Sequence, residues 1–353
     1  MTSAAVDPVV PDLPIADRPY PRSWIDLLIR WIDYGPAPAW LFYVLLAALL
    51  ALWSNAVMWI DGSQPAGTFV RLRVADGGYG VFFLALYHYL NSAARRSFRQ
   101  FEPVLDAPKA ESRTLEYRLT NLPRWLGVLA VLLGLGLETV SLRANPESFG
   151  VAGAHSPWPA ISLLVQSPLG FGCMFALALQ CIRQLRLVND LHARATDINL
   201  FQLGPAQALS GLTSRTGIGL IAFITYNRLV EGSDINFLNV VALVIMGALA
   251  VTVFVVPLLG MRGRLRAEQA RLVGEANARI QRTIGQIHAR IDAGEHEAVG
   301  NLRTTLSALI EERQLIEGIS TWPWRSSTLR GFASTLLLPI IIWLIQRLLA
   351  RLV

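Results

Sequence analysis

Glu138 and Arg215 are charged residues inside two long apolar stretches of the sequence, 125–142 and 204–227. A charge at the middle of a bilayer costs about 3 kcal/mol on insertion scales, so such residues usually pair with one another or serve transport. Counted along a helix from the start of each stretch, the two residues lie about 20 and 16 Å deep. The similar depths predict an ion pair with a role in structure, or in a gate, relay or permeation site. If the second stretch begins later, Arg215 instead stays at the membrane interface.

The tripeptide Gln166-Ser167-Pro168 interrupts another apolar stretch, 159–182. Proline lacks a backbone N–H and clashes with the preceding turn, so we expect the helix to kink or break here. A discontinuous helix forms the substrate site of some transporters. A simple kink only frees carbonyls that serine or water can satisfy. The sequence favours the kink, because it contains no convincing inverted repeat.

Arg347 and Arg351 are four residues apart near the end of the last apolar stretch, 331–353, and Gln346 adjoins them. Residues four apart share one helix face. If several copies arranged their last helices around an axis, these side chains would form a pore mouth that favours anions. In a single copy the arginines would extend to the lipid headgroups or end the span. Both interpretations stay open.

No catalytic motif accompanies these residues. The sequence contains no phosphate-binding glycine loop, no nucleophile elbow and no intramembrane protease pair. Its five histidines and two cysteines match no metal-ligand spacing. We therefore expect a protein that is not an enzyme and that holds no metal or cofactor.

The composition points to a membrane protein. Hydrophobic residues make up 53% of the chain and charged residues only 16%, against about 25% charged in ordinary soluble domains. A membrane-spanning helix needs about 20 apolar residues. We expect an all-α polytopic membrane helix bundle with about seven spans, whose main partner is the lipid bilayer. The expected spans are 37–60, 77–94, 125–142, 159–182, 204–227, 236–261 and 331–353.

The basic residues predict the orientation of this bundle. Of the 31 lysines and arginines, 25 fall in connections on the side of the N-terminus and four in connections on the other side. Cytoplasmic loops of membrane proteins carry the excess of positive charge. We therefore expect a bacterial inner-membrane protein with its N-terminus in the cytoplasm and its C-terminus outside. This sorting explains the net charge of +6 without a nucleic-acid partner.

The N-terminal region divides into a tail and a short helix. Residues 1–22 are rich in proline and aspartate and are expected to be disordered. Residues 23–34 begin with a serine at a capping position. Trp24 and Trp31 then fall on one face, which predicts an amphipathic helix lying in the membrane interface.

The one long polar region, 262–320, predicts a cytoplasmic antiparallel helical hairpin that joins the sixth and last spans. A turn with a capping glycine, 292–294, separates its two halves. Trp322 and Trp324 follow the second half and suit the membrane interface. The apolar residues of the two halves recur at coiled-coil spacings: Ile280, Ile284, Ile287 and Ile291, then Val299, Leu302, Leu306, Leu309 and Ile316.

Two functional classes follow from this organisation, and both stay open. The first is a homo-oligomeric channel or conduit that is gated through the hairpin. The second is a membrane-embedded sensor or scaffold, in which the hairpin 262–320 docks a cytosolic protein partner. A secondary transporter ranks third, supported by the Pro168 break and by the pair of Glu138 and Arg215.

Overall fold

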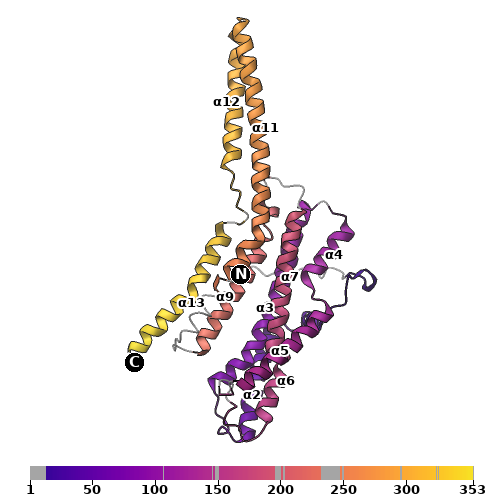
Figure 1. Ribbon diagram of the computed structural model, residues 1–353, viewed down its shortest axis with the longest axis vertical. Helices are drawn as coiled ribbons and strands as arrows, with labels where there is room; N and C mark the ends of the chain where they lie inside the picture. Colours follow the sequence, from indigo (N-terminus) through magenta and orange to yellow (C-terminus); the bar gives the residue numbers. More distant parts are fainter. Residues whose placement is uncertain are drawn as a thin grey trace.

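The computed structural model describes residues 13–105, 107–144, 146–147, 151–194, 200–201, 203–231, 247–248, 250–294, 296–322, 324 and 326–352. Within these residues the chain is helical, and its only β-type pairing is an isolated bridge between Arg22 and Pro123. The prediction of an all-α fold is confirmed. Figure 1 shows a bundle of helices from which one pair, α11 and α12, projects along the longest axis.

The elements follow one another along the chain as α-helices (α) and shorter 3-10 or π turns (η). They are η1 (Ile15–Asp17), α1 (Trp24–Tyr34), α2 (Ala39–Asp61), α3 (Arg71–Phe101), η2 (Glu102–Val104), α4 (Lys109–Thr120), α5 (Arg124–Ala144), α6 (Trp158–Gln166), η3 (Pro168–Gly172), α7 (Cys173–Ala193), α8 (Leu203–Ala206), α9 (Ser210–Glu231), η4 (Val256–Leu258), α11 (Leu259–Asp292), α12 (His296–Gly318) and α13 (Ser326–Leu352).

Five helical segments of the described chain are long and apolar enough to cross a membrane. They fall in α2, in α5, in the run from α6 to α7, in α8 and α9 together, and in α13. Each overlaps one of the predicted spans. α3, which covers the predicted span 77–94, is not among the five, and most of the predicted span 236–261 lies outside the described residues. The structure therefore supports a membrane protein, while the number of seven spans stays a prediction.

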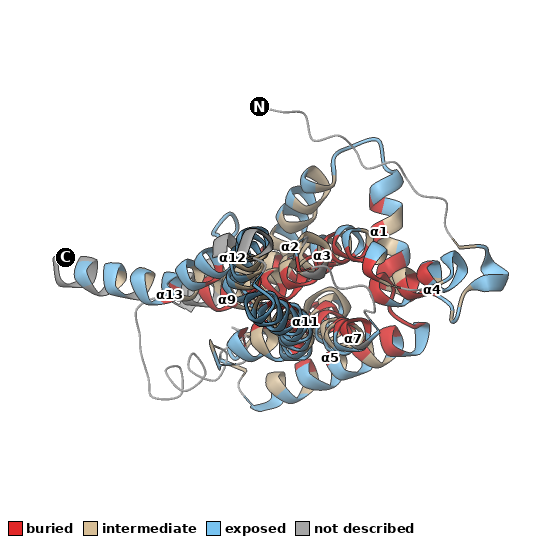
Figure 2. Cartoon of the chain, turned by 90° about the horizontal axis from the view of Figure 1, so that it is seen from above, coloured by how far each residue is buried: buried red, intermediate tan, exposed pale blue. Residues whose placement is uncertain are grey.

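The bundle is organised around α3. This helix packs against α2, α7 and α9, and α5 packs against α7. Figure 2 shows the buried residues gathered where α3, α5 and α7 meet, whereas α13 extends to one side and is largely exposed. Only 12% of the apolar window of α13 is buried within the chain, so lipid or another protein must cover the remainder if the helix spans a membrane.

The predicted break at Pro168 is a continuous but widened turn of helix. The backbone N–H of Gly172 donates to the carbonyl of Ser167 at 2.9 Å, which is the hydrogen bond of a π turn. Gly134 of α5 packs so closely on this turn that an added Cβ would lie 2.6 Å from the nitrogen of Gly172. Gly80 of α3 packs against the turn as well. The turn is therefore enclosed by the backbones of two other helices.

The helices α11 and α12 lie side by side and run in opposite directions (Figure 1). α11 has 34 residues and is therefore about 50 Å long. Gly294 lies at the turn that the sequence predicts, with a φ of 75° that a residue with a side chain rarely adopts. Two of the predicted contact residues are on the outer side, because Ile284 is 37% exposed and Ile291 is 47% exposed. The small residues Ala276 and Thr283 are buried in α11 instead.

Candidate functional site

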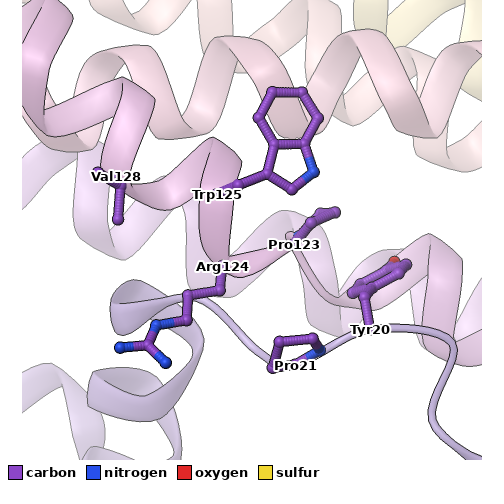
Figure 3. Close-up of a pocket in the computed structure, with 6 residues that line it drawn as sticks. All are labelled: Tyr20, Pro21, Pro123, Arg124, Trp125 and Val128. Atoms are coloured by element: carbon purple, nitrogen blue, oxygen red, sulfur yellow. The ribbon is translucent and has the colours of Figure 1, made fainter.

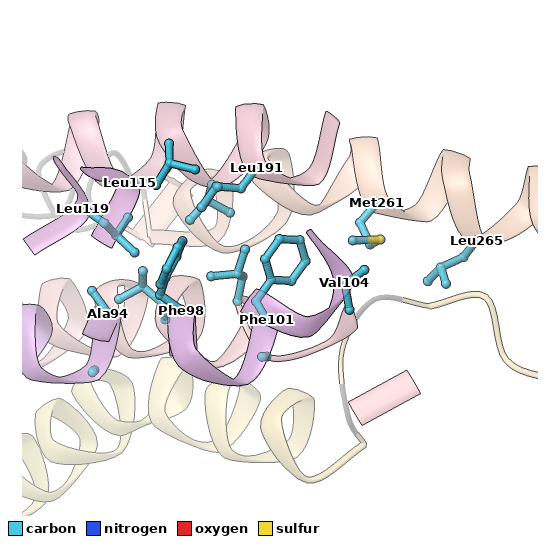
Figure 4. Close-up of a cluster of buried hydrophobic side chains, with 14 of the residues drawn as sticks. Ala94, Phe98, Phe101, Val104, Leu115, Leu119, Leu191, Met261 and Leu265 are labelled. Carbon is cyan, nitrogen blue, oxygen red and sulfur yellow. The ribbon is translucent and has the colours of Figure 1, made fainter. Parts of the chain in front are cut away.

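Several helices meet at the base of the α11–α12 pair. Figure 4 shows side chains of α3, α4, α7 and α11 packed into one apolar cluster there. Met261 and Leu265, in the first two turns of α11, are fully buried in this cluster. Phe98 and Phe101 at the end of α3 and Leu191 at the end of α7 belong to the same cluster. The start of α11 is therefore fixed to the helix bundle.

A group of aromatic side chains connects the two ends of the α11–α12 pair. We call Phe254, Arg262, Trp322, Trp324 and Phe332 the aromatic junction. The rings of Phe254 and Phe332 stack with their centroids 4.3 Å apart, and Trp324 lies 5.5 Å from Phe254. Trp322 lies 4.8 Å from Trp324, and the guanidinium carbon of Arg262 lies 3.6 Å from the Trp322 ring. Residues before α11 are thereby packed directly against residues after α12.

The aromatic junction also contacts α9. Gly217 faces Phe332 so closely that an added Cβ would lie 2.6 Å from its ring. Ile221 of α9 belongs to the same apolar cluster as Phe254 and Phe332. The aromatic junction therefore packs α9 and α13 against the ends of the α11–α12 pair.

A further contact joins α7 to the start of this region. The ring nitrogen Nδ1 of His192 lies 3.2 Å from the carbonyl oxygen of Pro257 in η4, the distance of a donated hydrogen bond. The ring is buried and packs on Phe101 with centroids 5.6 Å apart. His192 thus helps to hold the segment that leads into α11, a role that its sequence spacing does not indicate.

A buried carboxylate, which sequence analysis did not identify as a site, fixes the short helix α1. Asp26 accepts hydrogen bonds from the hydroxyl of Ser23 at 2.7 Å, from the hydroxyl of Tyr87 at 2.8 Å and from the backbone N–H of Leu122 at 2.9 Å. Burial raises the pKa of Asp26, and these donors oppose that effect. The capping pattern at Ser23 reveals only the local contact, because Tyr87 and Leu122 are distant in sequence.

The polar network continues into α7. The side-chain amides of Gln180 and Gln184 both donate to Oδ1 of Asn91, at 3.2 and 2.8 Å. Both also donate to the carbonyl of Leu119, at 3.1 and 3.0 Å. These contacts tie α3 and α7 to the end of α4, so we interpret the network as the polar support of this end of the bundle.

Glu138 is buried in α5. One turn before it, Gly134 packs on the π turn that also contacts Gly80 of α3. Tyr87 of α3 and Leu122, just before α5, both donate to Asp26 and so lie at a similar level. Further along α5, Gly134 lies near the level of Gly80, which comes earlier in α3. The two helices therefore run antiparallel. Glu138 is therefore level with the part of α3 that precedes Gly80. Measured along the bundle axis, it lies about 5 Å from Gly80.

Arg215 lies much nearer the opposite end of α3. Gly219, one turn after Arg215 in α9, packs on the side chain of Leu86. Near the end of α9, Tyr226 donates to the carbonyl of Ala75 at 2.7 Å, so α9 also runs antiparallel to α3. Arg215 is therefore about one helix turn beyond the level of Leu86, toward the end of α3.

Glu138 and Arg215 therefore lie at positions along the axis of α3 that differ by about 15–20 Å. The structure does not bring the predicted pair together. The reason is that α9 begins at Ser210, so Arg215 stands near the start of the helix, and its guanidinium extends back toward Gly211. The alternative in which the stretch begins later and leaves Arg215 at the membrane interface stays a prediction, because the candidate span that contains α9 runs from Leu203 to Tyr226.

The other predicted site residues are distributed over the molecule. Gln166 contacts the hydroxyls of Ser54 and Ser162, at 3.3 and 3.2 Å, within the bundle. Gln346 is half-buried in α13, while the side chains of Arg347 and Arg351 lie outside the described part.

The two N-terminal tryptophans lie on α1, and the interfacial position of this helix stays a prediction. Trp24 donates to the carbonyl of Gly127 at 3.0 Å, and Trp31 is exposed. The expected disorder of residues 1–22 differs from the structure at its end, where Arg22 is buried and bonded to Asn121 at 2.8 Å. Residues 1–12 lie outside the described part.

Metal ligands are not grouped in the part of the chain that the structure describes, where no three His, Cys, Asp or Glu side chains are placed to hold an ion. The sequence matches no model of a known protein family, and neither a curated protein nor a solved structure matches it.

Proposed function

We propose that the protein is a homo-oligomeric membrane channel or conduit that is controlled through the α11–α12 pair, which would form a hairpin in the cytoplasm. The aromatic junction is the observation that supports this proposal. It joins both ends of the α11–α12 pair to α9 and α13, so a force on the pair reaches two candidate membrane spans directly.

The exposed surface of α13 supports the oligomeric part of the proposal. α13 packs against α9 and leaves most of its apolar window uncovered within the chain. Identical subunits usually assemble as closed rings. In such a ring, the last helices of neighbouring copies would cover one another, and Gln346, Arg347 and Arg351 would face the pore mouth. The distribution of basic residues supports an inner-membrane protein with a cytoplasmic N-terminus and an external C-terminus.

The packing of α3 supports its role as a further span. Gly77 of α3 packs closely on the backbone of α2, because a Cβ added to it would lie 2.5 Å from the nitrogen of Ala51. The two helices are therefore in close contact. If α2 crosses the bilayer, α3 must return across it to reach α5. A span that is covered by other helices tolerates polar residues. With α3 and the segment 236–261, the proposed topology has about seven spans.

A membrane-embedded sensor or scaffold is the second candidate. It is favoured by the exposed apolar side chains of the α11–α12 pair, which a cytosolic partner would cover. These side chains are Ile284, Ile291, Ile310 and Leu315. The transporter interpretation loses its main support, because the turn at Pro168 is enclosed by Gly80 and Gly134 and does not form an open half-helix.

Conductance of the purified full-length protein tests the proposal. Its mass in detergent is first measured to establish the oligomer, and the same sample is then fused with planar bilayers. We expect ion conductance that varies with voltage or with the salt gradient. A confirmed oligomer that never conducts would overturn the channel. Two results together would favour the sensor. The wild type would bind a cytosolic partner that a variant with both Ile284→Glu and Ile291→Glu loses, and the wild type would not conduct.

A further inference from the structure

A pocket of about 460 Å³ lies where the N-terminal segment crosses the start of α5. Figure 3 shows the aromatic rings of Tyr20 and Trp125 on either side of Pro123, with Pro21 opposite. The pocket is lined by Tyr20, Pro21, Pro123, Arg124, Trp125 and Val128. It shares no lining residue with the aromatic junction, and it adjoins the network around Asp26.

Backbone hydrogen bonds make the walls of this pocket rigid. The N–H of Arg124 donates to the carbonyl of Pro21 at 3.0 Å, and the N–H of Ser23 donates to the carbonyl of Leu122 at 3.0 Å. Tyr20 donates to the carbonyl of Asn121 at 2.9 Å. The cavity is therefore preformed, as is common for ligand sites.

Two arginines lie at or near the pocket. Arg124 lines the pocket and is exposed to solvent. Behind Tyr20, Arg183 donates through Nη2 to the tyrosine hydroxyl at 2.8 Å, and its guanidinium carbon lies 5.1 Å from the ring centroid. The other terminal nitrogen of Arg183, Nη1, is buried and has no hydrogen-bond partner. An anionic group at the pocket would therefore be attracted by two guanidinium groups.

The pocket continues into an apolar face of a candidate membrane span. Trp125 is exposed in the first turn of α5, and Val128 and Leu132 are exposed one and two turns further along. Residues at this spacing share one face of the helix. A tryptophan next to an arginine at the start of a span is typical of the headgroup level of a bilayer.

We propose that this pocket binds the headgroup of an anionic phospholipid. Arg124 holds the phosphate, Arg183 adds positive charge behind Tyr20, and Trp125 packs on the glycerol region. One acyl chain follows Val128 and Leu132. The proposal rests on the membrane position of α5 but not on channel activity. A lipid fits better than free phosphate, because every lining residue except Arg124 presents a largely apolar surface to the pocket.

Native mass spectrometry of the delipidated full-length protein in detergent tests the site. The probes are phosphatidylglycerol, phosphatidylcholine of the same chain length and inorganic phosphate. The test variants are Arg124→Gln and Trp125→Ala. Arg143→Gln is the matched control, because Arg143 is exposed in the last turn of the same helix.

We expect phosphatidylglycerol to bind at least about fivefold more tightly than phosphatidylcholine, a difference of about 1 kcal/mol. Arg124→Gln should abolish this preference, Trp125→Ala should weaken binding of both lipids, and Arg143→Gln should change neither. Equal binding of the two lipids would overturn the proposal. So would an unchanged preference in Arg124→Gln, or full competition by inorganic phosphate, which would assign the pocket to a free anion. A protein that binds lipid here but does not conduct would leave this site intact and contradict only the proposed channel.

Discussion

The guanidinium carbon of Arg262 lies 3.6 Å from the centroid of the Trp322 ring. Arg262 is in the first turn of α11, and Trp322 follows the end of α12. The contact therefore closes the α11–α12 pair at its base. Because Trp324 and Phe254 continue this packing toward α13 and α9, the base of the pair and the candidate spans form one packed unit.

Substitution of Trp322 measures the strength of this closure. We expect Trp322→Ala to lower the free energy of unfolding by about 1 kcal/mol, the usual size of a cation–π contact at a partly exposed site. Trp322→Phe should retain part of it. Thermal unfolding in detergent is measured for Trp322→Ala, for Arg262→Gln and for the variant with both substitutions. The comparison gives the coupling energy between the two side chains. Trp40→Ala, on the exposed face of α2, is the control. A coupling energy of zero would show that the contact does not hold the base together.

Two glycines of α5 provide a matched test of the packing on the π turn. Gly134→Ala should destabilise the protein by about 1–3 kcal/mol, because the new methyl group would overlap the backbone of Gly172. Gly136 has open space around it, so Gly136→Ala should be neutral or stabilise the helix by up to about 1 kcal/mol. Equal melting temperatures for the two variants would contradict the close packing of α5 on η3.

The buried carboxylate of Asp26 predicts a dependence of stability on pH. Burial raises its pKa above the unfolded value of 3.8, so the folded protein holds this proton more tightly than the unfolded chain. The resulting stabilisation is complete below pH 3.8 and is lost as the pH rises through the folded pKa. In that window the wild type should lose up to about 1.4 kcal/mol per pH unit relative to Asp26→Asn.

Melting curves of the wild type, Asp26→Asn and the exposed control Asp17→Asn, recorded across this pH range, measure the difference. A wild-type curve that keeps a constant offset from Asp26→Asn would show that Asp26 does not titrate in the folded state with a raised pKa. Separately, at a pH below this window, Asp26→Ala should cost about 3 kcal/mol, because it leaves the three buried donors without an acceptor.

The charge on Glu138 should couple to Arg73 and not to Arg215. Arg73 is 2% exposed and precedes Gly80 in α3, on the same side of the π turn as Glu138. We expect Glu138→Gln and Arg73→Gln each to be destabilising and the double variant to be milder than their sum. Glu138→Gln and Arg215→Gln should be additive within about 0.5 kcal/mol, since their levels differ by about 15–20 Å. A coupling to Arg215 above 1 kcal/mol would contradict the arrangement of α5 and α9.

Several elements could be predicted from local patterns. The uncharged run 37–60 became α2 at Ala39–Asp61, and the glycine that was expected to end the first long polar helix does so at Gly294. Each feature depends on residues that are adjacent in sequence: an apolar run of sufficient length, or a residue without a Cβ in a left-handed conformation.

Features that depend on distant residues were predicted less well. The spacing of the isoleucines in α11 did not show that the smaller Ala276 and Thr283 are buried, because small residues permit a closer approach whose advantage depends on the partner helix. The separation of Glu138 from Arg215 depends on how α5 and α9 each pack along α3, which their own sequences do not show. Asp26 acquires its burial from Tyr87 and Leu122, so no local pattern could reveal its network.

Ion flux through the reconstituted oligomer, compared between the wild type and a variant of the aromatic junction, tests the central claim most directly. Phe254→Ala removes the stacked contact with Phe332, while Leu315→Ala alters an exposed residue of α12 and is the control. We predict ion flux in wild-type liposomes and the same flux in Leu315→Ala. Phe254→Ala should change the flux by at least about tenfold, equivalent to about 1.4 kcal/mol in the gating equilibrium. Wild-type flux that Phe254→Ala leaves unchanged, in a folded oligomer, would contradict control through the α11–α12 pair, and no flux from any oligomer would contradict the channel itself.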